Sequence, residues 1–190
     1  MFDCLSASCE ALFCVSFCGL DQFYYLCDIL ITTTMVRYLI LDLDGTVADL
    51  SHRLHFIQGD KKDYDSFYAA VGDDAPIDSV IHVVRSLVDL GRDTSLGGYH
   101  CIVCTGRPQR SIPATREWLR EQGLPCECDI FCRGDNDFRP DHVLKREFAQ
   151  ELLRRGVPLA HTVVFEDRKA CVDMWREYGC TVFQPADGNY

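Results

Sequence analysis

The sequence predicts an α/β fold in which a central parallel sheet carries helices on both faces. Three short apolar runs have the length and composition of buried strands: residues 38–41, 101–104 and 162–165. Apolar residues at helical spacing occupy the chain between and after them, at residues 79–90, 112–122 and 143–152. Since strands that alternate with helices build parallel sheets, we expect a single three-layer core.

The first apolar run ends in Asp42-Leu43-Asp44-Gly45-Thr46, which places two carboxylates one residue apart. Acids at the tip of a buried parallel strand do not serve the core and need a metal or a phosphate as partner. One Asp can attack phosphorus while the other, on the same side, protonates the leaving oxygen. Gly45 permits a sharp turn, and the Thr46 hydroxyl can hydrogen-bond a phosphate oxygen. The same motif taken alone is also typical of a solvated turn.

The segment from residue 51 to residue 77 is too short for a large lid domain, which predicts a small or absent cap and an open site. It contains Arg53 and the aromatic residues Tyr64, Phe67 and Tyr68. These three rings either stack on a nucleobase or form the inward face of a helix, and the spacing leaves both interpretations open.

The helix expected at 79–90 has five apolar residues that we expect to face inward: Val80, Val83, Val84, Leu87 and Val88. The second strand then ends in Thr105-Gly106-Arg107, which combines a hydroxyl, a flexible turn and a guanidinium suited to a phosphate. The next helix should end at Gly123.

Two further motifs complete a phosphate site. Asp141 and Lys145 stand four apart at the start of a helical pattern, so they share a face, and Lys145 can hold the charge of an aspartyl-phosphate. The third strand ends in Glu166-Asp167-Arg168, acids able to complete the shell of a hard cation. Each motif has an ordinary alternative: a loop Arg, an exposed helical ion pair or a solvated strand end. Their order, with three of the four at strand tips, favours phosphoryl transfer.

These motifs resemble the haloacid dehalogenase-like (HAD) phosphatases, whose motifs run DxD, Thr or Ser at a strand end, Lys, and a paired acid. Arg53, Arg107 and the stretches 132–145 and 166–175 further resemble the 3′-phosphatase domain of bacteriophage polynucleotide kinase. The similarity covers about residues 35–190. It implies a three-layer α/β/α Rossmann-like HAD fold with a small or absent cap.

The resemblance also implies roles for individual residues. Asp42 would be the nucleophile, Asp44 the general acid and later the base that activates water, and Lys145 the cation that neutralises the phosphate. The substrate-binding residues that we expect are, in chain order, Thr46, Arg53, Thr105, Gly106, Arg107 and Asp141. Asp44 must be protonated when the leaving alcohol departs, so we expect nearby carboxylates to raise its pKa and the pH optimum to be acidic to neutral.

Mg²⁺ is the cofactor that the resemblance implies. Its ligands would be the Asp42 carboxylate, the Asp44 backbone carbonyl, Glu166 and Asp167. The family pattern has two Asp at the last site, and Glu166 departs from it by one methylene. Octahedral magnesium tolerates displaced ligands poorly, so either Asp167 is the direct ligand or Glu166 acts through water.

Charge and motif content narrow the substrate class. The net charge of −10 argues against tight nonspecific binding to nucleic acid. A few local cations would still suffice to bind a strand end. The sequence contains no GxxxxGK[ST], so phosphorylation of 5′ ends by that route is not expected. We therefore expect a phosphorylated nucleic-acid 3′ end as substrate. The alternatives are free nucleotides or other small phosphomonoesters, or a catalytically inactive phosphate-binding module.

Residues 1–34 form a different kind of sequence, with no Lys or Arg and five of the twelve cysteines. We expect a leader of unknown role, followed by the phosphatase domain at residues 35–190. The leader's apolar stretches fall short of the ~20 residues of a membrane helix, and it lacks the basic start of a secretory signal, so no membrane association is expected. The scattered thiols suit a reducing compartment, which predicts a cytoplasmic location. The sequence does not indicate an oligomeric state.

Overall fold

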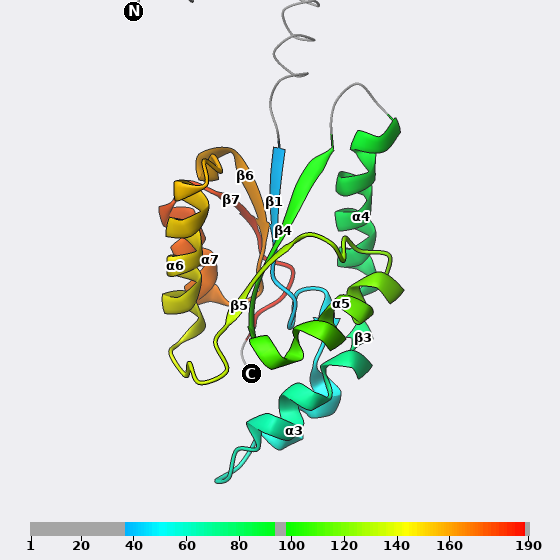
Figure 1. The fold of residues 1–190 in the computed structure, drawn as a ribbon, viewed down its shortest axis with the longest axis vertical. Helices are drawn as coiled ribbons and strands as arrows, with labels where there is room; N and C mark the ends of the chain where they lie inside the picture. The colour runs from blue at the N-terminus through cyan, green and yellow to red at the C-terminus, as the bar shows by residue number, and fades with distance from the viewer. Residues whose placement is uncertain (1–36, 94–97, 189–190) are drawn as a thin grey trace, which may run out of the picture.

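A five-stranded parallel sheet forms the centre of the computed structural model, which describes residues 37–93 and 98–188 and only the backbone of residues 90–93 (Figure 1). The strand order is β5-β4-β1-β6-β7, and all neighbouring strands run parallel. The bounds are β1 Arg37–Leu41, β4 Tyr99–Pro108, β5 Asp129–Arg133, β6 Thr162–Phe165 and β7 Thr181–Phe183. The three predicted strands are therefore confirmed and occupy the centre of the sheet. The prediction lacks β5 and β7, because these short edge strands carry partly exposed side chains and no continuous apolar run.

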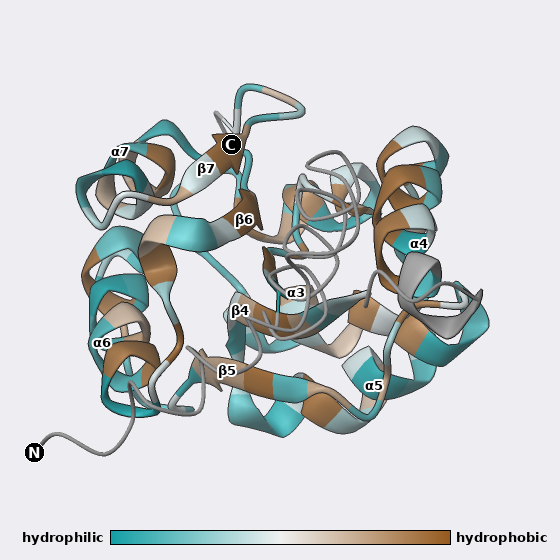
Figure 2. Cartoon of the chain, turned by 90° about the horizontal axis from the view of Figure 1, so that it is seen from above, coloured by the Kyte–Doolittle hydropathy of each residue, from teal (hydrophilic) through white to brown (hydrophobic). Residues whose placement is uncertain are grey.

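Helices cover both faces of the sheet, as predicted. Helices α4 (Asp78–Asp93) and α5 (Ile112–Glu121) lie on one face, and α6 (Asp141–Arg154) and α7 (Lys169–Glu177) lie on the other (Figures 1 and 2). Val84 of α4 is fully buried, but Val83 is 49% exposed, so its predicted inward position is wrong. The inward face of α4 runs through Ile81 and Val84, and Val83 lies about 100° around the helix from Val84.

Alternating side chains of each central strand supply the two halves of the core. Leu39 and Leu41 of β1 pack on the side of α4 and α5, and Ile40 packs on the side of α6 and α7. Cys101 and Cys104 of β4 are divided between the same two clusters, so both thiols are small buried core groups. A fully buried Leu or Ile contributes roughly 1.5–3 kcal/mol, which makes these central strands a rigid base for their carboxyl ends.

A small cap lies beyond the carboxyl ends of the strands (Figure 1). It consists of β2 (Ala48–Asp49) paired antiparallel with β3 (Ala75–Pro76), two 3₁₀ turns, η1 (Ser51–Phe56) and η2 (Val71–Asp73), and helix α3 (Tyr64–Ala69). The Asp63 carboxylate caps α3 by accepting a 3.0 Å hydrogen bond from Ser66 N. Among the residues with described placement, no helix is long and apolar enough to cross a membrane. The expectations for residues 1–34 fall outside the described part of the chain.

Candidate active site

Four buried charged side chains meet at the carboxyl ends of β1 and β6. Asp42 directly follows β1, and its backbone N–H donates to Phe165 O at 3.0 Å, which fixes it beside Glu166 and Asp167. Lys145 reaches them from α6: its Nζ donates to Asp42 Oδ1 at 2.7 Å and to Glu166 Oε2 at 2.6 Å. The structure thus brings together motifs that lie far apart in the chain.

The carboxylates of Asp42, Glu166 and Asp167 form a cluster that can hold a metal ion. One oxygen of each lies within 4.8 Å of the others, and all three residues are buried. The Thr46 hydroxyl lies 3.3 Å from Asp42 Oδ2 and 3.4 Å from Asp167 Oδ1, so in this structure it faces carboxylates. Burial, followed by the charge of Asp42, raises the pKa of Glu166 to about 8. The pKa of Asp42 is also raised, because its burial outweighs the effect of Lys145. Hard oxygen ligands whose charges repel one another fit a divalent cation such as Mg²⁺.

Two fully buried arginines share two carboxylates beside this cluster. Arg107, in β4, donates from Nε and Nη2 to Asp44 Oδ1 at 2.9 and 2.6 Å. Arg53, in η1, donates from Nη2 to the same oxygen at 2.6 Å. Both guanidiniums also contact Asp74, from Arg53 Nε at 2.7 Å and from Arg107 Nη2 at 2.6 Å. The arginines predicted to bind phosphate therefore pair with carboxylates in the structure.

This pairing overturns the expected titration of Asp44. Burial alone would raise its pKa, but Arg107 and then Arg53 outweigh burial and lower the pKa below its ordinary value. The expectation of a raised pKa is wrong for this structure. Neighbouring carboxylates alone would raise the pKa of Asp44, but two guanidiniums contact its carboxylate directly and lower it.

Asp74 is a buried member of the site that does not belong to any of the predicted motifs. In addition to the two arginines, His52 Nε2 lies 2.9 Å from Asp74 Oδ1. The Asp74 backbone carbonyl accepts a 2.7 Å hydrogen bond from Trp118 Nε1, which anchors the residue to α5. In the sequence, Asp73-Asp74-Ala75-Pro76 has the composition of a solvated turn, and no local signal separates Asp74 from its exposed neighbour Asp73.

Asp141 begins α6 and pairs with two arginines that are not among the predicted site residues. It accepts hydrogen bonds from Arg133 Nη2 and, at 2.7 Å, from Arg168 Nη1. Gly106 allows this approach, because a Cβ there would lie 2.9 Å from Asp141 Oδ1. Gly106 lies within β4, so the predicted turn at 105–107 is wrong, and the glycine supplies space at an irregularity in the pairing of β4 with β5. The buried Thr105 hydroxyl accepts from Arg107 N at 3.2 Å.

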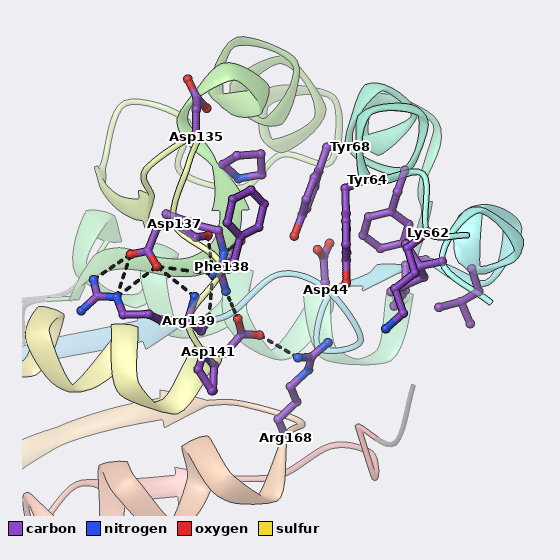
Figure 3. Close-up of a pocket in the computed structure, with 18 of the residues that line it drawn as sticks. Asp44, Lys62, Tyr64, Tyr68, Asp135, Asp137, Phe138, Arg139, Asp141 and Arg168 are labelled. Carbon is purple, nitrogen blue, oxygen red and sulfur yellow. Dashed lines mark hydrogen bonds and ion pairs between the residues drawn. The ribbon is translucent and has the colours of Figure 1, made fainter. Parts of the chain in front are cut away.

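Several of these groups line a pocket of about 350 Å³ (Figure 3). They are Asp42, Asp44, Gly106, Arg133, Asp141 and Arg168. Most of the rest of the lining comes from the cap, between residues 50 and 68, and from the loop between β5 and α6, and Pro108 and Arg110 complete it. The pocket is large enough for a phosphate together with an attached organic group.

Comparison with known families identifies the domain. The family model of the polynucleotide kinase PNKP phosphatase domain matches residues 36–190. The chain belongs to this family. It is therefore a HAD-superfamily phosphatase, a hydrolase, and the match contains every charged residue of the site described above.

Solved structures show the same fold. A chain of the Pnkp1/Rnl/Hen1 RNA repair complex aligns with 24% identity and a TM-score of 0.60, covering 83% of this chain and 45% of its own. A second Pnkp1/Rnl/Hen1 structure aligns with 25% identity and a TM-score of 0.59, covering 83% and 48%. A haloacid dehalogenase-like hydrolase from Streptococcus pneumoniae has 14% identity and a TM-score of 0.53, covering 78% and 84%. The present chain thus spans less than half of each Pnkp1-complex chain that it matches.

Proposed function

We propose that this PNKP-type phosphatase domain removes 3′-phosphate from DNA or RNA ends through an aspartyl-phosphate at Asp42. The observation that carries the proposal is the position of Asp42, which lines the pocket and has the Lys145 ammonium 2.7 Å from its Oδ1. This geometry supports nucleophilic attack by the Asp42 carboxylate. The fixed Lys145 ammonium would balance the charge that shifts as the carboxylate bonds to phosphorus. We also propose a cytoplasmic location, in line with the scattered thiols.

The proposed reaction has two steps. An Asp42 oxygen bonds to phosphorus, the ester bond to the 3′ oxygen breaks, and Asp44 gives its proton to that oxygen. Water then loses a proton to Asp44 and attacks phosphorus, which frees Asp42 and releases inorganic phosphate. Arg53 and Arg107 hold the phosphate in this scheme. A phosphate that draws them away from Asp44 removes the cause of its lowered pKa, so Asp44 becomes easier to protonate when substrate is bound.

The metal would be Mg²⁺, held by the carboxylates of Asp42 and Asp167 and by the Asp44 backbone carbonyl. When bound, it supplies positive charge against the phosphoryl oxygens. Glu166 Oε2 already accepts from Lys145, and its Oε1 accepts from Arg168 N at 3.3 Å. We therefore assign Glu166 to the metal through water, with positioning of Lys145 as its direct role.

Gly188 supplies a test of the metal assignment. Its backbone N–H donates to Asp167 O at 3.1 Å, and a Cβ at this position would overlap Asp167 Oδ2 and approach Arg168 Cγ at 2.8 Å. We expect Gly188→Ala to displace the Asp167 carboxylate and raise the Mg²⁺ concentration for half-maximal activity about tenfold or more. Titration of activity with Mg²⁺ measures this. Gly72→Ala is the control, because a Cβ there meets only Ala114 Cβ at 4.0 Å and the residue does not have a positive φ. An unchanged requirement in Gly188→Ala would remove Asp167 from the ligand set.

The pH dependence tests the assignment of Asp44. Because the acid must be protonated, we expect kcat to have an acidic-to-neutral optimum and to fall as the pH rises through the pKa of Asp44 in the substrate complex. The kcat profile across the acidic, neutral and alkaline range, determined at saturating substrate, measures this fall. A kcat that climbs steadily to high pH would contradict the assignment.

Free 3′-nucleotides are a second candidate substrate class. A pocket of about 350 Å³ lies at the small end of ligand sites, which run from roughly 300 to 1,000 Å³, and it accommodates one nucleotide. A polynucleotide end would place only its last residue there.

One comparison separates these substrates. Phosphate release is measured, with Mg²⁺ and with chelator, from a 3′-phosphorylated oligonucleotide, its 5′-phosphorylated twin and a 3′-mononucleotide. We expect preference for the 3′-phosphorylated oligonucleotide, dependence on Mg²⁺, and loss of release with Asp42→Asn. Equal or better turnover of the mononucleotide would assign the enzyme to small metabolites. No release from any phosphomonoester would leave a phosphate-binding module.

A further inference from the structure

Three aromatic side chains that are not buried line the pocket, together with the buried Phe67. Phe138, in the loop between β5 and α6, is 80% exposed, and Tyr64 of α3 is 40% exposed. The ring of Tyr68, one turn further along α3, is 6.4 Å from that of Tyr64 between centroids, with an interplanar angle of 20°. In Figure 3, Phe138 lies on one side and the two tyrosines on the other, with Asp44 close to the tyrosines. An exposed Phe and two tyrosines that line the same pocket offer ring surface to a bound ligand.

Helix α3 contributes one buried ring and two rings that are not buried. Phe67 is buried, with the Arg53 guanidinium 4.2 Å above its ring centroid, so it packs on the inner side of the cap. Phe67 lines the pocket together with Tyr64 and Tyr68, but only the two tyrosine rings are not buried. Arg110 lies over the Tyr68 ring at 5.8 Å and is itself held by a 2.8 Å bond from its backbone N–H to Asp135. Of the two interpretations left open by the sequence, Phe67 takes the core role, while the tyrosines are available to stack.

The charges of the pocket do not form a track for a phosphate backbone. Its cationic lining residues are Lys62, Arg110, Arg133, Arg139 and Arg168, and its acidic ones are Asp42, Asp44, Asp135, Asp137 and Asp141. Most of these cations are already paired: Arg139 with Asp137 and Glu147, and both Arg133 and Arg168 with Asp141. Binding of the strand beyond its terminal phosphate must therefore come mainly from a contact other than neutralisation of backbone phosphates.

We propose that Phe138 on one side and Tyr64 with Tyr68 on the other form an aromatic slot that holds the terminal nucleobase of a 3′-phosphorylated strand while its phosphate reaches Asp42. The inference rests on the proposed function and specifies how that site binds the nucleobase of its substrate. Stacking is tolerant of base identity, so the slot accepts all four bases. Because few phosphates are neutralised, binding depends only weakly on salt.

The test compares a 3′-phosphorylated oligonucleotide with a twin whose last nucleotide lacks its base. Dissociation constants are measured with the Asp42→Asn protein, which keeps the slot and does not turn substrate over, alone and combined with Phe138→Leu. We expect the missing base to weaken binding about tenfold when Phe138 is present, as loss of one stacked base does, and less than about twofold when Phe138→Leu is added. Leu153→Ala, which removes an exposed apolar side chain of α6 outside the pocket, should leave the tenfold ratio intact.

Each outcome decides between separate claims. Equal binding of the two oligonucleotides, or a ratio that Phe138→Leu leaves unchanged, overturns the slot even when wild-type turnover confirms 3′-phosphatase activity. A steep loss of affinity with salt, of the size that several phosphate contacts produce, overturns it as well. Failure of the wild-type protein to release 3′-phosphate overturns the proposed function, while the dissociation constants still report whether the aromatic rings bind a base.

Discussion

The Asp42→Asn protein should fold like the wild type and lose at least about 10³-fold in phosphate release, because a carboxamide is not a competent nucleophile toward phosphorus. The fold should survive the change, since Lys145 keeps its 2.6 Å bond to Glu166 and its buried ammonium stays paired. Initial rates on a 3′-phosphorylated oligonucleotide, together with the circular dichroism spectrum and the thermal midpoint, measure both expectations.

The matched control is Asp173→Asn, the same chemical change at an exposed α7 residue whose partner is Lys169. It should keep wild-type activity to within a factor of about two, because it removes only a surface ion pair. An Asp42→Asn protein that retained a tenth or more of wild-type activity would contradict nucleophilic attack by Asp42.

Asp74→Ala should have the largest effect on stability, a loss of about 3–5 kcal/mol in the free energy of unfolding. The substitution leaves Arg53 and Arg107 fully buried with Asp44 as the carboxylate that both still contact. Urea unfolding of the variant and of the wild type measures the difference. Asp74→Asn retains one acceptor oxygen and should lose less stability, and its substrate KM should rise, because the two guanidiniums are less firmly positioned for phosphate.

Asp73→Ala provides the comparison for Asp74→Ala, because this neighbouring carboxylate is exposed. It should change the free energy of unfolding by less than about 0.5 kcal/mol. If the two alanine variants were equally stable, the buried contacts of Asp74 would not hold the arginine pair in place. A KM for Asp74→Asn equal to that of the wild type would separate stability from phosphate binding.

The centre of the fold could be predicted because each of its strands is a continuous apolar run that is visible in the local sequence. The runs at 38–41, 101–104 and 162–165 are continuous and apolar because both faces of the sheet are covered, and all three are central strands in the structure. Parallel strands bring their carboxyl ends to one edge, so the residues after β1 and β6 had to meet. The edge strands β5 and β7 lack this signal.

The partners of the charged groups could not be predicted from the sequence. Arg107 contacts Asp44 across 63 residues and Asp74 across 33, and nothing in either local segment specifies these pairs. The lowered pKa of Asp44 follows from them, which is why the sequence indicated the opposite direction. Asp141 and Lys145 share a helix, as their spacing required, yet Lys145 contacts Asp42 while Asp141 contacts Arg133 and Arg168.

Trapping the phosphorylated enzyme tests the covalent route most directly. The wild-type protein is mixed with excess 3′-phosphorylated oligonucleotide and Mg²⁺, quenched in acid within the first turnover, digested and analysed by mass spectrometry. We predict one added phosphoryl group on the peptide that contains Asp42, located on that side chain and absent from the Asp42→Asn protein. Complete release of phosphate in the first turnover with no phosphorylated peptide, or a phosphoryl group on a different residue, would contradict the account.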